Sequence, residues 1–313
     1  MFKNPHPLLL RPAIFFRIRF FNAATVVIVT FIVFSCTREE TEAPLFTEAA
    51  AEETGIAFAN TVNQDGDNNV LNYPYYFNGG GVAVGDINND GLDDIFFTGN
   101  QVAPKLYLNK GDFRFEDITQ EAGVEVKEGW KTGVTMADVN QDGLLDIYVC
   151  RSAMADSALR KNLLFINNGN LTFRERAGEY GVDDNSYSTQ AAFFDYDKDG
   201  DPDVFVLNHS LPRFAGFNNM LVNNKKRRAQ KFNSKLFRND NGHFVDVSEE
   251  AGIINNVLSF GLGVAVSDLN QDGWPDIYVS NDFNEEDYLY LNNGDGTFTD
   301  KVRDATGHVS LFS

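Results

Sequence analysis

The sequence predicts an all-β fold, a β-propeller of four-stranded blades. Three observations support this prediction. One pattern of residues recurs four times between residues 79 and 308, each copy contains four short runs with the composition of strands, and no long amphipathic helix separates them. Short strands at regular spacing, with turn residues between them, are typical of propeller blades. A repeat of roughly 50 residues therefore predicts one blade for each copy.

The first half of each repeat predicts two strands that flank an Asp-rich loop. A small or Gly-rich apolar run comes first, such as residues 79–85 in the first repeat. A β-branched and aromatic run follows the loop, such as residues 147–149 in the second repeat. Residues of these types favour strands. Within the propeller region 45–313 we place the repeats at residues 79–128, 129–185, 186–256 and 257–308, with the start of a further repeat at 309–313.

The second half of each repeat predicts a hairpin with Asn and Gly at its turn, because these residues tolerate the positive φ that tight turns require. Each repeat then closes with an acidic, turn-like segment that ends in Ala-Gly, Tyr-Gly or Thr-Gly. The four predicted hairpins run from residues 106–109 to Phe113, from 164–167 to Phe173, from 236–239 to Phe244 and from 289–292 to Phe298.

Both ends of the repeat region predict an open ring. Residues 45–56 are similar to the last part of a repeat without its first part, and we expect them to supply a strand that completes the last blade. Residues 308–313 begin the approach to a further Asp loop. Propellers have about four to eight blades, and four blades with an incomplete repeat at each end do not make the larger ring that such repeats usually form. We therefore expect a fragment of a longer protein, with a four-bladed propeller as the alternative.

The four Asp loops share the form D-x-[DN]-x-D-G-x-x-D and align without a gap. Side chains at positions 1, 3, 5 and 9 and the backbone carbonyl at position 7 offer oxygen atoms around one point, and Gly at position 6 permits the sharp turn. The candidate metal ligands are therefore Asp86, Asn88, Asp90, Leu92 and Asp94; Asp138, Asn140, Asp142, Leu144 and Asp146; Asp195, Asp197, Asp199, Asp201 and Asp203; and Asp268, Asn270, Asp272, Trp274 and Asp276.

Calcium is the metal that this donor set predicts, because Ca²⁺ takes six to eight oxygen ligands. No Cys or His lies in the loops, which disfavours zinc and copper. An EF-hand would need Glu at position 12, where Phe97 and Val149 stand in the first two loops. We expect about four Ca²⁺ ions with a structural role, since the protein oxygens fill the shells and leave no open position for catalysis.

The N-terminus predicts export and a lipid anchor. Residues 1–35 contain no acid, and an apolar stretch at 20–34 is shorter than the roughly 20 residues that a spanning helix needs. Ser35-Cys36 follows and resembles a lipoprotein cleavage site. We expect a signal peptide at 1–35, lipidation of Cys36, a tether at 36–44 and a place in the cell envelope, on the outer membrane and at its surface. The alternative is an ordinary signal peptide or an uncleaved anchor.

The net charge of −19 argues against nucleic-acid binding, which needs a basic surface. The main basic feature of the mature chain is an insertion between Asn208 and Lys235, with Lys and Arg at 225–228. It is a candidate site for an anionic glycan, a lipid headgroup or a protein partner, and a solvated insertion is the alternative. His209, Cys150 and Trp130 are expected to serve packing.

At this point the chain closely resembles the FG-GAP or VCBS repeat proteins, whose blades carry this loop in integrin α-subunit propellers. Residues 77–86 and 289–298 are similar to the family in which an ASPIC/UnbV domain follows the propeller. The resemblance covers about residues 45 to 313. It implies a calcium-stabilised propeller on an exported protein and no defined ligand.

The sequence contains no G-x-S-x-G elbow, no paired His and no phosphate-binding Gly loop. The leading hypothesis is a binding or adhesion module for protein or polysaccharide, without enzyme activity. A polysaccharide hydrolase or lyase is the alternative, and it would need acids that converge on one face apart from the calcium loops. A scaffold subunit of an envelope complex is a third hypothesis.

Overall fold

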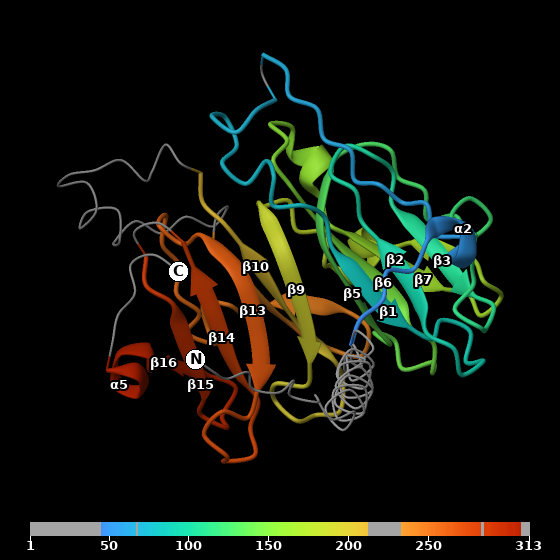
Figure 1. Cartoon of the computed structure of the whole chain (residues 1–313). Coiled ribbons are helices and arrows are strands. Elements are labelled where there is room, and N and C mark those ends of the chain that lie inside the picture. The colour runs from blue at the N-terminus through green and yellow to red at the C-terminus, as the bar shows by residue number, and fades with distance from the viewer. Residues whose placement is uncertain (1–44, 67, 212–232, 283–284, 308–313) are drawn as a thin grey trace, which may run out of the picture. The chain divides into compact units, whose positions relative to one another are not determined.

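The computed structural model describes residues 45–66, 68–211, 233–282 and 285–307. The chain divides into two compact units, Met1–Ala49 and Ala50–Ser313, and the second unit contains every sheet. Within the described residues, sixteen strands form four antiparallel sheets of four strands each, and the strands of each sheet follow one another in chain order (Figure 1). The predicted all-β fold of four-stranded blades is confirmed.

The four sheets are called blades 1 to 4 in chain order. In each blade the two hairpins pair through the second and third strands. Blade 1 consists of β1 (Val82–Gly85), β2 (Asp94–Phe97), β3 (Lys105–Asn109) and β4 (Phe115–Asp117). Blade 2 consists of β5 (Trp130–Ala137), β6 (Asp146–Ser152), β7 (Leu163–Asn167) and β8 (Phe173–Glu175). Blade 3 consists of β9 (Ser188–Phe194), β10 (Asp203–Asn208), β11 (Lys235–Asn239) and β12 (Phe244–Asp246). Blade 4 consists of β13 (Gly261–Ser267), β14 (Asp276–Asn281), β15 (Tyr288–Asn292) and β16 (Phe298–Asp300).

The hydrophobic core lies between successive blades, because both faces of an internal blade are apolar. The first strands β1, β5, β9 and β13 adjoin one another in that order. Phe96 and Leu106 of blade 1 pack with Ile147 and Phe165 of blade 2, and similar clusters join blade 2 to blade 3 and blade 3 to blade 4. Burial of these faces against each other is the main favourable term that holds the blades together.

The first and last blades expose apolar positions that the internal interfaces bury. Val84 of β1 is 58% exposed, and Val82 on the same strand is 56% exposed. The residue equivalent to Val82 in blade 2 is Val134, which is 8% exposed and packs against blade 1. Leu269 in the loop of blade 4 is 50% exposed, whereas its equivalent Ile87 is 2% exposed.

Short helices occupy several connections: α2 (Ala51–Thr54), α3 (Ala177–Tyr180), α5 (Val302–Thr306) and the 3-10 helix η1 (Ser157–Arg160). The expected strand at residues 45–56 is not present; α2 forms there and ends at Gly55 in the left-handed conformation, as α3 ends at Gly181. The segment therefore has the form of a repeat tail. None of the helices in the described ranges is long and apolar enough to cross a membrane.

One predicted hairpin boundary is wrong. We expected the second strand of the first hairpin to include Phe113, but β4 begins at Phe115. Asp112 and Phe113 have positive φ, and Phe113 is 64% exposed. The turn is longer than its Gly and Asp suggest, so Phe115 takes the buried position that Phe173 takes in blade 2.

Candidate functional site

The four Asp loops lie at equivalent places, each between the first and second strand of its blade. Position 1 directly follows the first strand, as Asp86 follows β1, and position 9 is the first residue of the second strand, as Asp94 begins β2. The loops thus connect the same two strands at the same end of every blade, and each loop lies on the rigid framework of a sheet.

Hydrogen bonds inside each loop bend the backbone around the position-1 carboxylate. In the first loop Gly91 donates its N–H to Asp86 Oδ2 over 2.7 Å, and Leu92 donates its N–H to Asp90 Oδ1 over 2.9 Å. Gly91 has φ 85° and Asn89 has φ 58°. Gly adopts this conformation without strain, and Asn tolerates it better than most residues. The other three loops repeat these contacts.

The position-9 carboxylate is held on both sides. Asp94 Oδ2 accepts the N–H of Ile87 over 2.9 Å, and Asp94 Oδ1 accepts the N–H of Asn109 over 2.7 Å. The carboxylate is buried, at 1% exposure. Each oxygen has a further lone pair, so the two bonds orient the group and still leave it able to bind a cation. The equivalent residues Asp146, Asp203 and Asp276 are buried and accept the same pair of backbone bonds.

Burial shifts the pKa of three of these carboxyl groups. It raises the pKa of Asp146 to about 6 and the pKa of Asp203 to about 7, and it also raises the pKa of Asp94. Backbone hydrogen bonds oppose the shift, and neighbouring loop acids add to it. A divalent cation beside these oxygens would favour the ionised form and reverse the shift.

The third loop has the highest density of acids. Carboxylate oxygens of Asp195, Asp197 and Asp203 all lie within 4.8 Å of one another, and this is the only group of three or more acidic, His or Cys ligands found among the described residues. Position 3 is Asp197 here, whereas the other loops have Asn at that position. In those loops the Asn amide donates to the position-5 carboxylate, as Asn88 donates to Asp90 Oδ2 over 3.0 Å. The structure thus brings three acidic ligand candidates together in the third loop, whereas the acids at positions 1, 5 and 9 of the other described loops do not lie within this distance of one another.

The structure shows two kinds of contact that support the loops and that the sequence did not predict. The Asn at the end of each third strand holds the position-9 carboxylate through its backbone, as Asn109 does for Asp94. The position-4 side chain contacts the next loop, as Asn89 Nδ2 donates to the Gly143 carbonyl over 2.9 Å. The recurrence of Asn in all four hairpins was the available signal, but we had assigned it to the turn alone.

His209 serves packing, as predicted. It is fully buried, its Nδ1 lies 2.7 Å from the Ser210 carbonyl oxygen, and its Nε2 lies 2.9 Å from Ser152 Oγ. This geometry fits a neutral ring that donates from Nδ1 and accepts at Nε2. Burial lowers the pKa of His209 to about 4. Because Ser152 is fully buried as well, the pair has no access to a substrate.

Of the other residues that the sequence analysis discussed, Cys150 and Trp130 lie in the core and Trp274 lies in an Asp loop. Cys150 is fully buried in β6, and burial raises the pKa of its thiol. Trp130 is buried against Tyr73 and Tyr76. Trp274 lies in the fourth loop. Cys36, the tether, most of the basic insertion and residues 309–313 lie outside the described residues.

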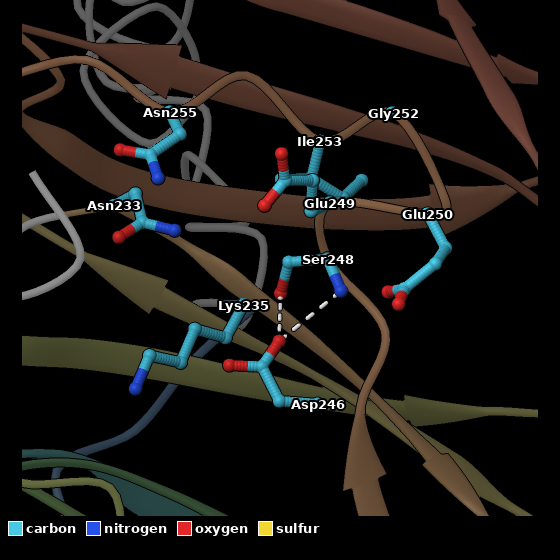
Figure 2. Close-up of a pocket in the computed structure, with 9 residues that line it drawn as sticks. All are labelled: Asn233, Lys235, Asp246, Ser248, Glu249, Glu250, Gly252, Ile253 and Asn255. Carbon is cyan, nitrogen blue, oxygen red and sulfur yellow. Dashed lines mark hydrogen bonds between the residues drawn. The ribbon is translucent and has the colours of Figure 1, made fainter. Parts of the chain in front are cut away.

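A polar pocket of about 570 Å³ lies beside β11 and β12 of blade 3 (Figure 2). Asp246 accepts two hydrogen bonds from Ser248, one from its N–H over 3.1 Å and one from its hydroxyl over 2.5 Å. Lys235 pairs with Asp184 at 2.7 Å. Asn233 is 5% exposed, and its Oδ1 accepts no hydrogen bond from any residue that the structure describes. The complete lining is Asn233, Lys235, Asp246, Ser248, Glu249, Glu250, Gly252, Ile253 and Asn255.

Comparison with known proteins places this architecture in a family. The model of the FG-GAP-like repeat matches residues 86–149, 153–206 and 268–311, more than half of the chain, and two of these matches begin at position 1 of an Asp loop. Cartilage acidic protein 1 of Xenopus tropicalis is 31% identical over 205 residues, which are 66% of this chain and 29% of that protein.

Two mammalian forms of the same protein show a similar match. Cartilage acidic protein 1 of Homo sapiens is 26% identical over 206 residues, which are 66% of this chain and 28% of that protein. The protein of Mus musculus is 26% identical over 205 residues, or 66% of this chain and 29% of that protein. The chain thus spans less than a third of the length of these relatives. With the blades, the loops and the matched repeats together, the chain belongs to the family of FG-GAP-like repeat proteins.

Proposed function

We propose that this chain is a calcium-stabilised binding module, in which the Asp loops hold Ca²⁺ and the blades present a surface to a protein or polysaccharide. The observation that supports calcium most strongly is the fourfold repetition of one all-oxygen loop. In each copy the position-9 carboxylate is already oriented by two backbone N–H groups, as Asp203 is by Tyr196 and Asn239. Preorientation of this kind reduces the ordering that ion binding requires.

The donor set fits Ca²⁺ better than other common metals. The side chains at positions 1, 3, 5 and 9 and the carbonyl at position 7 are all oxygen donors, which suits a hard cation that accepts six to eight ligands. In the third loop the ligands would be Asp195, Asp197, Asp199 and Asp203 with the Asp201 carbonyl. The bound ion would offset the mutual repulsion of these carboxylates, and its role would be structural.

The polar pocket of blade 3 is the candidate ligand surface. Asp246, Glu249 and Glu250 bring carboxylates to its wall, and Asn233 brings a buried acceptor. These groups suit a ligand rich in hydroxyl or ammonium donors, such as a polysaccharide or a basic protein surface. Since the acids lie apart from the Asp loops, the pocket is also where the alternative, a polysaccharide hydrolase or lyase, would have its acid groups.

Attachment to a membrane through a lipid on Cys36 is part of the proposal and rests on the sequence alone. It would hold the blades in the cell envelope, at the outer membrane, where calcium at about 10⁻⁴ to 10⁻³ M suffices for extracellular modules. Metabolic labelling with a radioactive fatty acid, followed by membrane fractionation, tests this anchor. We expect label and membrane association for the parent and neither for Cys36→Ser.

Isothermal titration with CaCl₂ after EDTA treatment tests the calcium sites directly. We expect binding to the parent chain, and a weaker and smaller signal after Asp195→Asn with Asp199→Asn. A glycan array and a pull-down then test the ligand surface, with Asp246→Asn and Glu250→Gln as the pocket variant. Turnover of a polysaccharide by the parent, lost in that variant, would favour the enzyme alternative. If EDTA-treated protein takes up no calcium, the proposed function is wrong.

A further inference from the structure

A line of hydrogen bonds joins the position-9 carboxylates of neighbouring blades. Asn167, at the end of β7, donates its backbone N–H to Asp146 Oδ1 over 2.8 Å. Its side-chain amide donates to the carbonyl of Ile87, in the loop of blade 1, over 2.8 Å. Ile87 in turn donates its N–H to Asp94 Oδ2 over 2.9 Å. Two residues therefore connect the carboxylate of Asp94 to the carboxylate of Asp146.

The same connection recurs at the next two interfaces. The amide of Asn239 reaches the Val139 carbonyl over 3.3 Å, and the amide of Asn292 reaches the Tyr196 carbonyl over 2.8 Å. The line is therefore continuous across all four loops. In order, its members are Asp94, Ile87, Asn167, Asp146, Val139, Asn239, Asp203, Tyr196, Asn292 and Asp276.

Among the described residues, the hydrogen bonds of Asn109, the equivalent residue in blade 1, all lie within its own blade. Its N–H donates to Asp94 Oδ1 over 2.7 Å, and its amide donates to the Asp93 carbonyl over 2.8 Å. No blade precedes blade 1 in the described part of the chain. A substitution of Asn109 thus removes the side-chain bond to the Asp93 carbonyl, keeps the backbone bond to Asp94 and leaves the connections between blades untouched.

Direct contacts between the loops follow the same direction along the chain. Gln141, at position 4 of the second loop, donates from Nε2 to the Gly200 carbonyl over 2.6 Å. At the next interface Lys198 Nζ lies 4.2 Å from the centroid of the Trp274 ring. Each loop therefore touches its successor both at its tip and, through the Asn residue, at its base.

We propose that Asn167, Asn239 and Asn292 are positioning residues that couple the ion sites of neighbouring blades. Calcium at one site then raises the affinity of the next. This inference rests on the proposed function, that the loops bind Ca²⁺. A bound ion fixes its loop and its position-9 carboxylate. The Asn residue is held by this carboxylate through its backbone N–H and by the neighbouring loop through its side-chain amide, so a fixed position on one side restricts motion on the other. The second ion then has less disorder to remove, which is the physical basis of positive cooperativity.

Trp274 provides a local signal for the fourth site, because it occupies position 7 of that loop. In a Trp130→Phe background, its fluorescence during a CaCl₂ titration measures the affinity of the fourth site. Asp195→Asn with Asp199→Asn disables the third site. We expect this loss to weaken calcium binding at the fourth site by at least about fivefold. When Asn292→Leu has removed the bridge, we expect the same loss to have no effect.

In each background, the affinity of the fourth site with the third site intact is divided by its affinity with the third site disabled. A direct effect of Asn292→Leu on the fourth site enters both affinities and cancels in this ratio. The matched control, Asn109→Leu, should leave the fivefold ratio intact. An equal ratio with and without the bridge would overturn the proposal, because long-range electrostatics or the contact between Lys198 and Trp274 would then explain the coupling. If Asn292→Leu fails to fold, Asn167→Leu answers the same question by calorimetry, with the first site disabled by Asp86→Asn and Asp90→Asn. Absence of any calcium response in the parent would contradict the proposed function instead.

Discussion

A Cβ atom on Gly181 would lie 2.6 Å from the carbonyl oxygen of Phe244, so the tail of blade 2 packs directly on the fourth strand of blade 3. Blade tails meet the next blade in the same way elsewhere. The equivalent distances are 3.3 Å for Gly123 and Phe173, 3.0 Å for Gly252 and Phe298, and 2.3 Å for Gly55 and Phe115. The Gly that ends each of these four tails is therefore an element of the interface with the blade that follows it.

Gly181→Ala should destabilise the fold more than Gly242→Ala. Both residues have positive φ, at 82° and 87°, so both substitutions carry the backbone strain of about 1–2 kcal/mol. At Gly242 the nearest atom to a Cβ is on Tyr180 at 4.0 Å, whereas at Gly181 the Phe244 carbonyl must move. We expect a further loss of about 1–3 kcal/mol for Gly181→Ala in urea unfolding. Equal losses would contradict the interface role.

The sequence predicted the turn at Gly181 but did not predict the contact of this turn with Phe244 of the next blade. A Gly that follows an acidic run indicates a chain reversal, which Gly181 does form. Which neighbour lies against the turn depends on the next copy of the repeat, about 60 residues later, and the pattern within one copy contains no information about it. The unexpected α2 has a different reason: residues 45–56 were matched to the last part of a repeat but were expected to form a strand, whereas the tails that end at Gly181 and Gly307 are short helices.

Removal of calcium should lower the melting temperature. At a calcium concentration one hundred times the dissociation constant, one site stabilises the folded state by about 2.7 kcal/mol. For a domain of this size that corresponds to roughly 5–10 °C. Sites of the extracellular type have dissociation constants of about 10⁻⁴ to 10⁻³ M, so ~2 mM CaCl₂ stabilises the folded state by about 0.6–1.8 kcal/mol per site. Because about four sites act together, we expect a shift of at least roughly 5 °C between ~2 mM CaCl₂ and EDTA in differential scanning calorimetry. Magnesium at the same concentration is the control and should restore little of the shift.

Asp203→Asn and Asp201→Asn should have different consequences in the third loop. Asp203 accepts from the N–H groups of Tyr196 and Asn239, and an amide has only one oxygen to offer them. One N–H would face an NH₂ group, at a cost of about 1–3 kcal/mol, and calcium binding at this loop would be lost. In the proposed site Asp201 would contribute only its backbone carbonyl, so Asp201→Asn should retain binding. Calorimetry on both variants checks this, and similar losses in both would contradict the assignment of position 7.

The difference between Asp203 and Asp201 also shows which features of the site could be predicted from the sequence. The spacing of Asp, Asn and Gly was sufficient to propose all twenty ligand positions, because loop ligands are close in sequence. It was not sufficient to show that Asp203 is buried and doubly held, since its partner Asn239 is 36 residues away and lies beyond the long insertion. The links from one loop to the next depend on the order of the blades in space, and only the structure provides that.

The stabilisation by calcium should increase as the pH rises. In the ion-free protein, burial raises the pKa of Asp146 to about 6 and that of Asp203 to about 7, above their unfolded value near 4. The folded state then binds more protons than the unfolded state between about pH 4 and 7, so its stability falls as the pH rises through this window. Calcium holds both groups ionised and removes that loss. We expect the difference in melting temperature between calcium and EDTA to grow from pH 5 to pH 7.5; a constant difference would contradict the role of these carboxylates.

His209 should make the stability of the folded state fall as the pH falls, which is opposite to the effect of Asp146 and Asp203. Burial lowers the pKa of His209 to about 4, below the unfolded value of about 6.5. The unfolded state therefore binds a proton first, and the stability that the neutral ring provides is present above about pH 6.5 and is lost as the pH falls towards 4. The shift corresponds to about 3 kcal/mol over this window.

His209→Gln replaces the ring with a neutral side chain, so this part of the pH dependence should disappear although the variant is less stable at pH 7. Urea unfolding of parent and variant between pH 4 and 7, at one fixed calcium concentration, measures the difference. The titration of the Asp loops is common to both proteins and cancels in that difference. His243 is exposed on the turn before β12, so His243→Gln is the matched control for the effect of a His-to-Gln substitution itself. A His209→Gln variant with the parent's slope would show that His209 is protonated in the folded state as readily as in the unfolded chain.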